Sequence, residues 1–454
     1  MESFHSVAQN AAGTRSSPNS WVVYLAAAVA ALGGLLFGYD TAVINGALVF
    51  LKRQLALSTA GAEFAASSLL IGCALGAGVA GFLSDRFGRK WLLFSCAALF
   101  VLSSIGAALP HSLLQFVTAR FFGGIAIGIA SMLAPLYIAE ISPAAIRGRL
   151  VTLNQLAIVI GILVAFIVDY YLSALGSNGW RWMFGVAGIP SLCFMLAVAF
   201  VPESPRWLVQ KGRIQNAAQV LKTISGQEQA RLEVQNIQAA VAEESGSMFD
   251  RRLTKPWLIA LGLAILQQIT GINTILYYGS LLFAEHIPRQ SDASALLANV
   301  IIGLTNLIFT IVAMFAVDRF GRKSLLLWTS AGMALSLLAL ATASHFHAAG
   351  ILLLIFILLY VASFATGMGP VVWIVMAEIF PTRVRSRALS LATLCLWLAC
   401  LLVTATFLSL VNTLGVSGTF FLYAFISIFA YVFISKNVPE TKGRTLEEIE
   451  SQWR

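Results

Sequence analysis

Asp85-Arg86-Phe87-Gly88-Arg89-Lys90 is repeated letter for letter as Asp318-Arg319-Phe320-Gly321-Arg322-Lys323, each time where a long apolar run meets a cluster of positive charge. A second pair of blocks follows in register, AEISPAAIRGR at 139–149 and AEIFPTRVRSR at 377–387. A third pair, VPE at 201–203 and at 438–440, closes the series. One half of the chain is therefore a copy of the other, and repeats of this length are bundles of helices rather than solenoid units.

The composition indicates a membrane protein, because 59% of the 454 residues are hydrophobic and 11% are charged. In a soluble domain about half of the residues are hydrophobic and about a quarter are charged. We count twelve apolar runs long enough to cross a bilayer core of about 30 Å, and therefore predict an all-α integral membrane fold with twelve transmembrane helices. The predicted spans are Trp21 to Leu51, Ala62 to Leu83, Trp91 to Leu109, Ser112 to Ile138, Val151 to Leu172, Arg181 to Val201, Trp257 to Phe283, Ser294 to Val317, Ser324 to Ser344, Ile351 to Met376, Ala388 to Val411 and Gly418 to Ser435.

Positive charge is concentrated in alternate connections between these runs. A net charge of +9 would suggest nucleic acid as the partner of a soluble protein, but here the opposite connections hold only Lys52, Arg53 and Arg289. The positive-inside rule then places both termini and the central loop in the cytoplasm. The basic connections contain Arg86, Arg89, Lys90, Arg147, Arg149 and the basic residues of 206–255, 319–323, 383–387 and 436–444.

The chain divides into five parts. Residues 1–20 are polar and lack the apolar core of a signal peptide, so we predict a disordered cytoplasmic tail. The two six-helix halves occupy 21–201 and 257–435, and 436–454 form a second cytoplasmic tail. The linker 202–256 has two amphipathic stretches, 213–220 and 229–244. It could bind a regulatory partner, but we expect a cytoplasmic latch upon which the bundles close.

Four motifs carry a family resemblance: PESPRWL at 202–208, PLYIAEISPAAIRG at 135–148, QQITGIN at 267–273 and VPETKGRTLEEIE at 438–450. With them the chain resembles the sugar porter family of the major facilitator superfamily, over essentially its whole length. Bacterial proton-coupled xylose, galactose and glucose symporters are similar to it. The resemblance implies two pseudo-symmetric six-helix bundles, a sugar site between them and alternating access.

A monosaccharide is neutral, with hydroxyls that donate and accept and with apolar C–H faces, so its pocket needs amides and aromatic rings. Gln268 and Asn273 are five residues apart and share a face only if Thr270-Gly271 breaks the helix. The alternative role for buried amides is to hold helices together, and Gln267 or Asn306 could individually be structural. By resemblance, the amides that hold the sugar ring are Gln155, Gln267, Gln268, Asn273 and Asn306.

Two tryptophans, Trp373 and Trp397, stand where the family stacks rings against the sugar, and Tyr277 and Tyr278 stand where it closes the outer gate. Aromatic residues in membrane helices more often serve packing or interfacial anchoring. Trp373 follows the Gly-Met-Gly-Pro hinge at 367–370, and with the family match this favours Trp373 over Trp397 as the ring that stacks on the sugar.

The chain departs from the family at two positions of this region. Leu396 stands directly before Trp397, where many sugar porters have Asn or Gln. Cys400 stands where they often have Asn. At least one hydroxyl contact is therefore missing or is supplied from elsewhere, which leaves the identity of the sugar open.

Asp40 lies deep in the first span, where an unpaired charge costs at least a few kcal/mol. Arg120 of the fourth span is a candidate partner. In proton-coupled relatives the matching acid carries the proton, and the matching arginine sets its proton affinity. The alternative is a permanent salt bridge, although buried pairs stabilise poorly. We expect Asp169, near the outer end of the fifth span, to be solvated or capping.

A further set of charged residues lies at the cytoplasmic helix ends. Such pairs can lock the halves with the outer side open, and breaking them would open the inner gate. Helix capping and orientation are the alternatives. The candidate gating residues are Glu140 with Arg147, Glu378 with Arg385, and Asp85, Arg89, Asp318 and Arg322 of the two DRFGRK blocks.

Other classes of function find little support in the sequence. We recognise no phosphate loop, zinc-spaced histidines or nucleophile elbow, so we expect no enzyme, cofactor or metal site. A sugar sensor would carry long cytoplasmic extensions, and Asp40 argues against a passive uniporter, although a polyol or inositol substrate stays open. The predicted partners are a monosaccharide, a proton and membrane lipid, with no nucleic acid, for a monomer in the cell membrane.

Overall fold

The fold is described from a computed structural model for residues 20–143, 146–242, 250–286, 292–348, 350–380 and 382–442. Within these ranges there are ten apolar helical stretches long enough to cross a membrane. Two of them, Arg149–Phe200 and Arg387–Asn437, have 52 and 51 residues. A straight helix of that length would measure about 75 Å, far more than the bilayer core. Each contains a break, near Gly176 (φ 70°) and at Gly415 (φ 72°), so each crosses twice and twelve crossings result.

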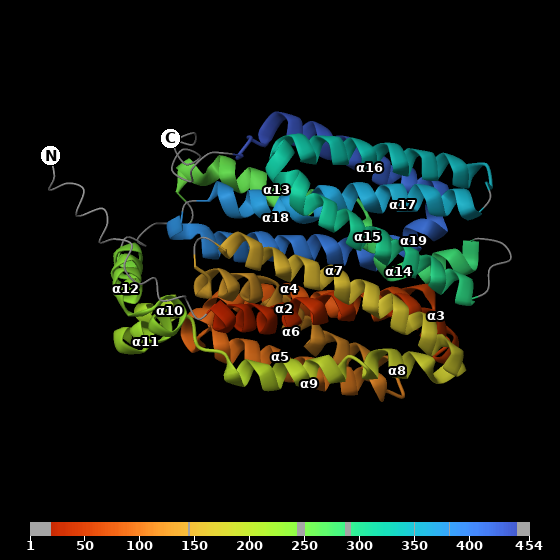
Figure 1. The fold of residues 1–454 in the computed structure, drawn as a ribbon. Helices are drawn as coiled ribbons and strands as arrows, with labels where there is room; N and C mark the ends of the chain where they lie inside the picture. The colour runs from red at the N-terminus through yellow and green to blue at the C-terminus, as the bar shows by residue number, and fades with distance from the viewer. Residues whose placement is uncertain are drawn as a thin grey trace.

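The helices of each half pack mainly with one another, and the two halves lie face to face (Figure 1). The first half contains α2 (Ser20–Ala42), α3 (Ile44–Gln54), α4 (Thr59–Phe87), α5 (Arg89–Ala108), α6 (Leu113–Ile141), α7 (Arg147–Leu172), α8 (Gly179–Gly185) and α9 (Gly188–Phe200). The second contains α13 (Thr254–Ile269), α14 (Ile272–His286), α15 (Asp292–Phe320), α16 (Arg322–His345), α17 (Gly350–Thr366), α18 (Met368–Ile379) and α19 (Thr382–Asn437). These are the two predicted bundles.

The linker forms three helices at one end of the bundles, α10 (Pro205–Gln210), α11 (Ile214–Ser225) and α12 (Gln227–Ala242) (Figure 1). The sequence predicts the last two but not α10, which begins where Ser204 accepts a hydrogen bond from the Trp207 N–H and Pro205 occupies the first turn. We call this end, which also carries both DRFGRK blocks, the basic face, and the opposite end the far end. The predicted N-terminal tail, apart from the backbone of Ser20, lies outside the described residues.

Glycine pairs allow α4 and α6 to approach closely. A Cβ on Gly124 would lie 1.9 Å from the Leu69 carbonyl oxygen, and one on Gly72 would lie 2.1 Å from the Phe121 oxygen. Gly76 and Gly128 repeat the contact one turn further along each helix. In lipid, helices associate through such small-residue contacts, since hydrophobic exclusion from water no longer drives them together.

Three of the spans are interrupted inside the membrane. The predicted break at Thr270-Gly271 is confirmed, because α13 ends at Ile269, Gly271 has φ +93° and α14 starts at Ile272. The Gly-Met-Gly-Pro run interrupts a second span at Gly367, between α17 and α18. The first span breaks at Val43, between α2 and α3, which the sequence did not predict. Each break exposes backbone groups that only protein can satisfy in a bilayer.

We predict that Gly124→Ala destabilises the protein by at least about 1–3 kcal/mol, the usual cost of overpacking, because the new methyl group meets backbone that cannot rotate away. Gly78→Ala is the matched control, since its nearest neighbours would be Leu394 methyl carbons at 3.8 Å. Thermal unfolding in detergent measures both variants. Equal melting temperatures would contradict the close-packing argument.

Candidate functional site

The three repeated blocks of the first half meet at the basic face. Arg89 donates to the Glu140 carboxylate through Nε (2.9 Å) and Nη2 (3.0 Å). Ser204 Oγ donates to the same carboxylate. Glu203 accepts the backbone N–H groups of Arg89 (2.9 Å) and Lys90 (3.2 Å) at the start of α5. A carboxylate at a helix N-terminus accepts hydrogen bonds from the free N–H groups there. Its negative charge also interacts favourably with the positive end of the helix dipole.

Gly88 explains why the motif contains glycine. Its φ is +93°, and a Cβ there would lie 2.4 Å from Glu203 Oε2. A side chain would therefore displace the carboxylate that caps α5.

The second half repeats the arrangement. Glu440 accepts the N–H groups of Arg322 (2.9 Å) and Lys323 (3.1 Å), and Arg322 Nη2 lies 3.2 Å from Glu378. Thr441 Oγ1 donates to Glu378 at 2.6 Å, as Ser204 does to Glu140 in the first half. The two carboxylates that cap helices differ in electrostatics. Burial raises the pKa of Glu203 despite its backbone donors, whereas for Glu440 the backbone donors outweigh burial and lower the pKa.

One of the two predicted gating pairs is corrected by this geometry. Glu140 pairs with Arg89 and not with Arg147, whose Nη2 reaches the Ser142 carbonyl at 3.5 Å. Asp85 of the same block lies 3.4 Å from Arg89. The contacts of Arg89 and the Arg322–Glu378 pair each stay within one bundle, so in this state they orient helices rather than join the halves. The side chains of Asp318 and Arg385 lie outside the described residues.

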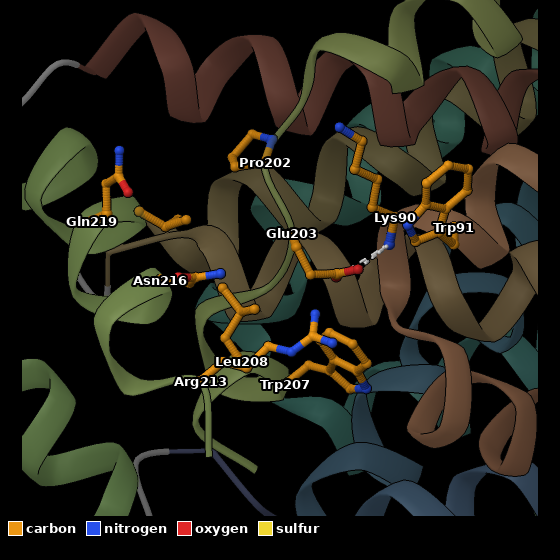
Figure 2. Close-up of a pocket in the computed structure, with 10 residues that line it drawn as sticks. Lys90, Trp91, Pro202, Glu203, Trp207, Leu208, Arg213, Asn216 and Gln219 are labelled. Atoms are coloured by element: carbon orange, nitrogen blue, oxygen red, sulfur yellow. Dashed lines mark hydrogen bonds between the residues drawn. The ribbon is translucent and has the colours of Figure 1, made fainter. Parts of the chain in front are cut away.

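A cavity of about 320 Å³ adjoins this first cluster, between the start of α5, residues 202–203 and helices α10 and α11. Figure 2 shows the Glu203 side chain pointing across it towards Lys90, with Arg213 and Trp207 below. Trp207 Nε1 donates to the Asp85 carbonyl at 3.0 Å. The linker is thereby fixed to the first bundle.

A chain of amides lies at the break between α13 and α14. Gln267 Nε2 donates to the carbonyls of Met368 (2.6 Å) and Gly369 (2.9 Å), at the start of α18. Gln268 Nε2 donates to Gln267 Oε1 (3.1 Å), and Asn273 Nδ2 donates to Gln268 Oε1 (2.5 Å). The helix break thus brings these three predicted site residues together.

The bonds already made decide which amide groups are available to a ligand. Both N–H donors of Gln267 are occupied, which favours the structural role that the sequence left open. Asn273 Nδ2 also donates to Cys400 Sγ at 3.1 Å, which leaves its carbonyl oxygen and one N–H of Gln268 free. In the described part of the chain, no hydrogen bond joins Gln155 on α7 or Asn306 on α15 to this cluster.

Aromatic side chains surround the amides. Trp373 on α18 is half-buried, whereas Trp397 on α19 is 3% exposed and its ring lies 5.4 Å from that of Phe37 on α2. Tyr277 OH lies 4.0 Å from Cys400 Sγ, and Tyr278 OH donates to the Thr404 carbonyl at 2.7 Å. Cys400, at a position where the family often has Asn, is therefore in contact with both the amide cluster and a predicted gate tyrosine. Leu396 is buried one residue before Trp397.

Asp40 and Arg120 are neighbours, as their predicted pairing requires. Arg120 Nη1 lies 3.8 Å from Asp40 Oδ1, and Arg120 Nη2 donates to the Asp40 carbonyl oxygen at 2.7 Å. The guanidinium also lies over the Phe184 ring, 5.1 Å from its centre. Because α2 ends at Ala42, Arg120 satisfies a carbonyl of its last turn and carries the charge that a helix C-terminus favours.

Asp169 is not solvated as expected, because it is 1% exposed. The expected capping role fits better: Oδ2 accepts the Gly46 N–H at 3.1 Å, in the first turn of α3. This half-helix exists only because the first span is broken, so the sequence did not indicate which N-terminus Asp169 would cap. Its Oδ1 has no hydrogen-bond partner in the described part of the chain.

The sequence missed a polar contact that joins the bundles at the far end. Asn45 on α3 donates through Nδ2 to the Leu276 carbonyl (2.9 Å) and accepts the Ser280 N–H through Oδ1 (2.7 Å). Asn299 on α15 also donates to Asn45 Oδ1 (3.3 Å) and to Ser280 Oγ (2.6 Å). In a regular helix the Ser280 N–H would donate to the Leu276 carbonyl. Here the Asn45 amide bonds to both of these groups instead. The two bundles are therefore in contact on this side of the molecule.

Two helix bundles that meet around buried amides, in a chain that crosses the bilayer twelve times, define a membrane carrier for a polar solute. Residues 26–453 match the family described as Sugar (and other) transporter. The chain is 38% identical to the arabinose-proton symporter of Bacillus subtilis (strain 168), over 97% of each chain. It is 39% identical to the D-xylose-proton symporter of Escherichia coli (strain K12), over 96% of each, and 39% identical to the glucose transport protein of Synechocystis sp., over 96% and 98%.

Solved structures give the same result. The partially occluded inward open conformation of the xylose transporter XylE from E. coli matches with a TM-score of 0.84 at 38% identity, covering 93% of this chain and 99% of that one. The proton:xylose symporter XylE bound to 6-bromo-6-deoxy-D-glucose matches with a TM-score of 0.82 at 38% identity, covering 96% and 100%. The chain belongs to the sugar porter family of the major facilitator superfamily. It is a multi-pass membrane sugar transporter and not an enzyme.

We predict that Gln267→Ala lowers stability by about 1–3 kcal/mol, because two carbonyls at the start of α18 each lose one buried hydrogen bond. Gln268→Ala is the control, since the Gln268 amide donates to Gln267 and accepts from Asn273 but makes no bond to α18. It should unfold nearer the wild-type temperature. Thermal unfolding in the same detergent compares the two, and an equal loss in both would refute the structural role of Gln267.

Proposed function

We propose that the protein imports a monosaccharide together with a proton, by alternating access of the site between the bundles to the two sides of the membrane. The observation that carries the coupling is Asp40, an acid 4% exposed at the break of the first span and 3.8 Å from Arg120. The arabinose-proton and D-xylose-proton symporters at 38–39% identity support the same reading.

The sugar is proposed to bind between the free amide groups of Gln268 and Asn273, Gln155 and Asn306 on facing helices, and the ring of Trp373. Each free group can donate to or accept from a hydroxyl. Gln267 supports this site by holding the α17–α18 break. Trp397 closes one side from its buried position, with Tyr277 and Tyr278 as the outer gate.

The basic face is proposed to be cytoplasmic, because the positive charge of the connections gathers there. Both termini then lie in the cytoplasm, and the protein acts as a monomer in the cell membrane. The far end, where Asn45 joins the bundles, corresponds to the outer side. In this assignment the structure represents a state in which the outer gate is shut.

Uptake of a panel of labelled monosaccharides and polyols into proteoliposomes, with and without an imposed proton gradient, tests the proposal. Accumulation that needs the gradient and collapses with an uncoupler is the expected result. Saturable uptake that ignores the gradient would make the protein a passive uniporter. Preference for inositol or another polyol would correct the substrate, and binding without uptake would indicate a sensor.

We predict that Asp40→Asn abolishes uphill accumulation while sugar binding and exchange between equal sugar pools persist. The amide resembles the protonated acid, so the carrier still changes state but takes up no proton. In the wild type one proton moving down 100 mV releases about 2.3 kcal/mol, and at about 1.4 kcal/mol per tenfold this supports a sugar gradient of roughly fifty-fold.

Counterflow and gradient-driven uptake of the same labelled sugar separate these two activities. Asp169→Asn is the matched control, because it neutralises a second buried acid of the same bundle. Accumulation that survives Asp40→Asn and disappears in Asp169→Asn would move the proton site to Asp169.

We predict that Leu396→Asn changes the order of sugar preference more than the turnover, because it restores an amide where the pocket wall is apolar. Competition of a sugar panel against the preferred substrate measures the change. An unaltered inhibition order would mean that Leu396 does not face the sugar.

A further inference from the structure

Glu63 is an acid buried at the interface between the bundles. It lies in the second turn of α4, at the far end, and is 6% exposed. In the described part of the chain it makes no ion pair, so no basic side chain offsets the cost of removing its charge from water. A buried acid of this kind needs hydrogen-bond donors.

Both donors come from one residue of the other bundle. Ser409 on α19 donates its backbone N–H to Glu63 Oε1 at 2.7 Å and its hydroxyl to Oε2 at 2.8 Å. Hydrogen bonds to an ionised carboxylate are about twice as strong as those between neutral groups. The contact joins positions that are 346 residues apart in the chain.

The adjacent turn of α19 contacts Tyr278, the proposed outer gate tyrosine. Tyr278 OH donates to the Thr404 carbonyl, and the Tyr278 ring stacks on Phe407 with centres 5.3 Å apart. In an uninterrupted helix the Ser409 N–H would donate to the residue four positions earlier, so Glu63 competes with the helix for it. Glu63 from the first bundle and Tyr278 from the second therefore hold one segment of α19 from two sides.

We propose that Glu63 is a positioning residue for the transport cycle: its bonds to Ser409 latch the two bundles together when the far end is closed, and they part when it opens. The proposal rests on the alternating access proposed above. In the open state water solvates both partners. Glu63 thus sets the balance between the closed and open far end without touching the sugar.

A double-mutant cycle on the conformational equilibrium tests the latch without requiring a transported sugar. Spin labels on Ala60 of the first bundle and His345 of the second, both exposed at the far end, report its opening by pulsed electron paramagnetic resonance in nanodiscs. The background carries Cys193→Ser and Cys395→Ser, since the other cysteines are buried. The variants are Ser409→Ala, Glu63→Ala and the double variant.

Ser409→Ala removes the hydroxyl donor and keeps the backbone one, so we expect it to raise the open-to-closed ratio about tenfold, the usual effect of losing a hydrogen bond to a charged group. In the Glu63→Ala background the same substitution should have no effect. Asn412→Ala is the matched control. It removes an exposed contact across the same interface, Asn412 Nδ2 to Thr59 Oγ1 at 3.2 Å, and should leave the ratio within about twofold of the wild type.

Two results overturn the latch: an unchanged ratio in Ser409→Ala, or an equal shift whether or not the chain also carries Glu63→Ala. Failure of the underlying function looks different. A label distance that no sugar, proton concentration or variant changes would refute alternating access itself, whereas a distance that responds to sugar but not to Ser409→Ala refutes only the latch.

Discussion

A polar backbone group in a bilayer must find its partner within the protein, and this requirement governs the three interrupted spans. Arg120 donates to the Asp40 carbonyl at the end of α2, and the Tyr360 hydroxyl donates to the Thr270 carbonyl at the end of α13. At the third break, Gln267 donates to two carbonyls in the first turn of α18, which also accept helical bonds. Each polar side chain that supports a break is thereby placed beside the candidate sites. The fold and the centre of the molecule depend on the same bonds.

The duplicated sequence blocks encode a duplicated contact. In each half a glycine with positive φ permits a carboxylate to cap a helix, an arginine binds a second carboxylate, and a hydroxyl donates to that second carboxylate. None of these blocks reaches its partner by sequence proximity: Arg89 and Glu203 are 114 residues apart. Spaced so widely, the blocks fix the relative positions of helix ends that are far apart in the sequence.

Much of the fold follows from the sequence, because apolar runs and charge asymmetry are local properties. The break at Thr270-Gly271 could be predicted since it was the one way to place Gln268 and Asn273 on a common face. The break at Val43 could not, because Val43 is neither glycine nor proline and the Asp40 carbonyl left free there is satisfied by Arg120 of another helix. The partners of Glu140, Asp169 and Asn45 were equally inaccessible, since each is selected by helix packing and not by spacing along the chain.

The two bundles differ in chemistry despite their common ancestry in sequence. The acid–arginine pair lies in the first bundle, and the amide cluster around Gln268 and Asn273 lies in the second. A proton at Asp40 can influence the amide cluster of the second bundle only across the interface. Phe37, three residues before Asp40 on α2, lies against Trp397 of α19, and Cys400 one turn later contacts Asn273. If Asp40 carries the proton, a shift of α2 on protonation is therefore transmitted to the amides by direct packing, and the coupling needs no charged group in the sugar site.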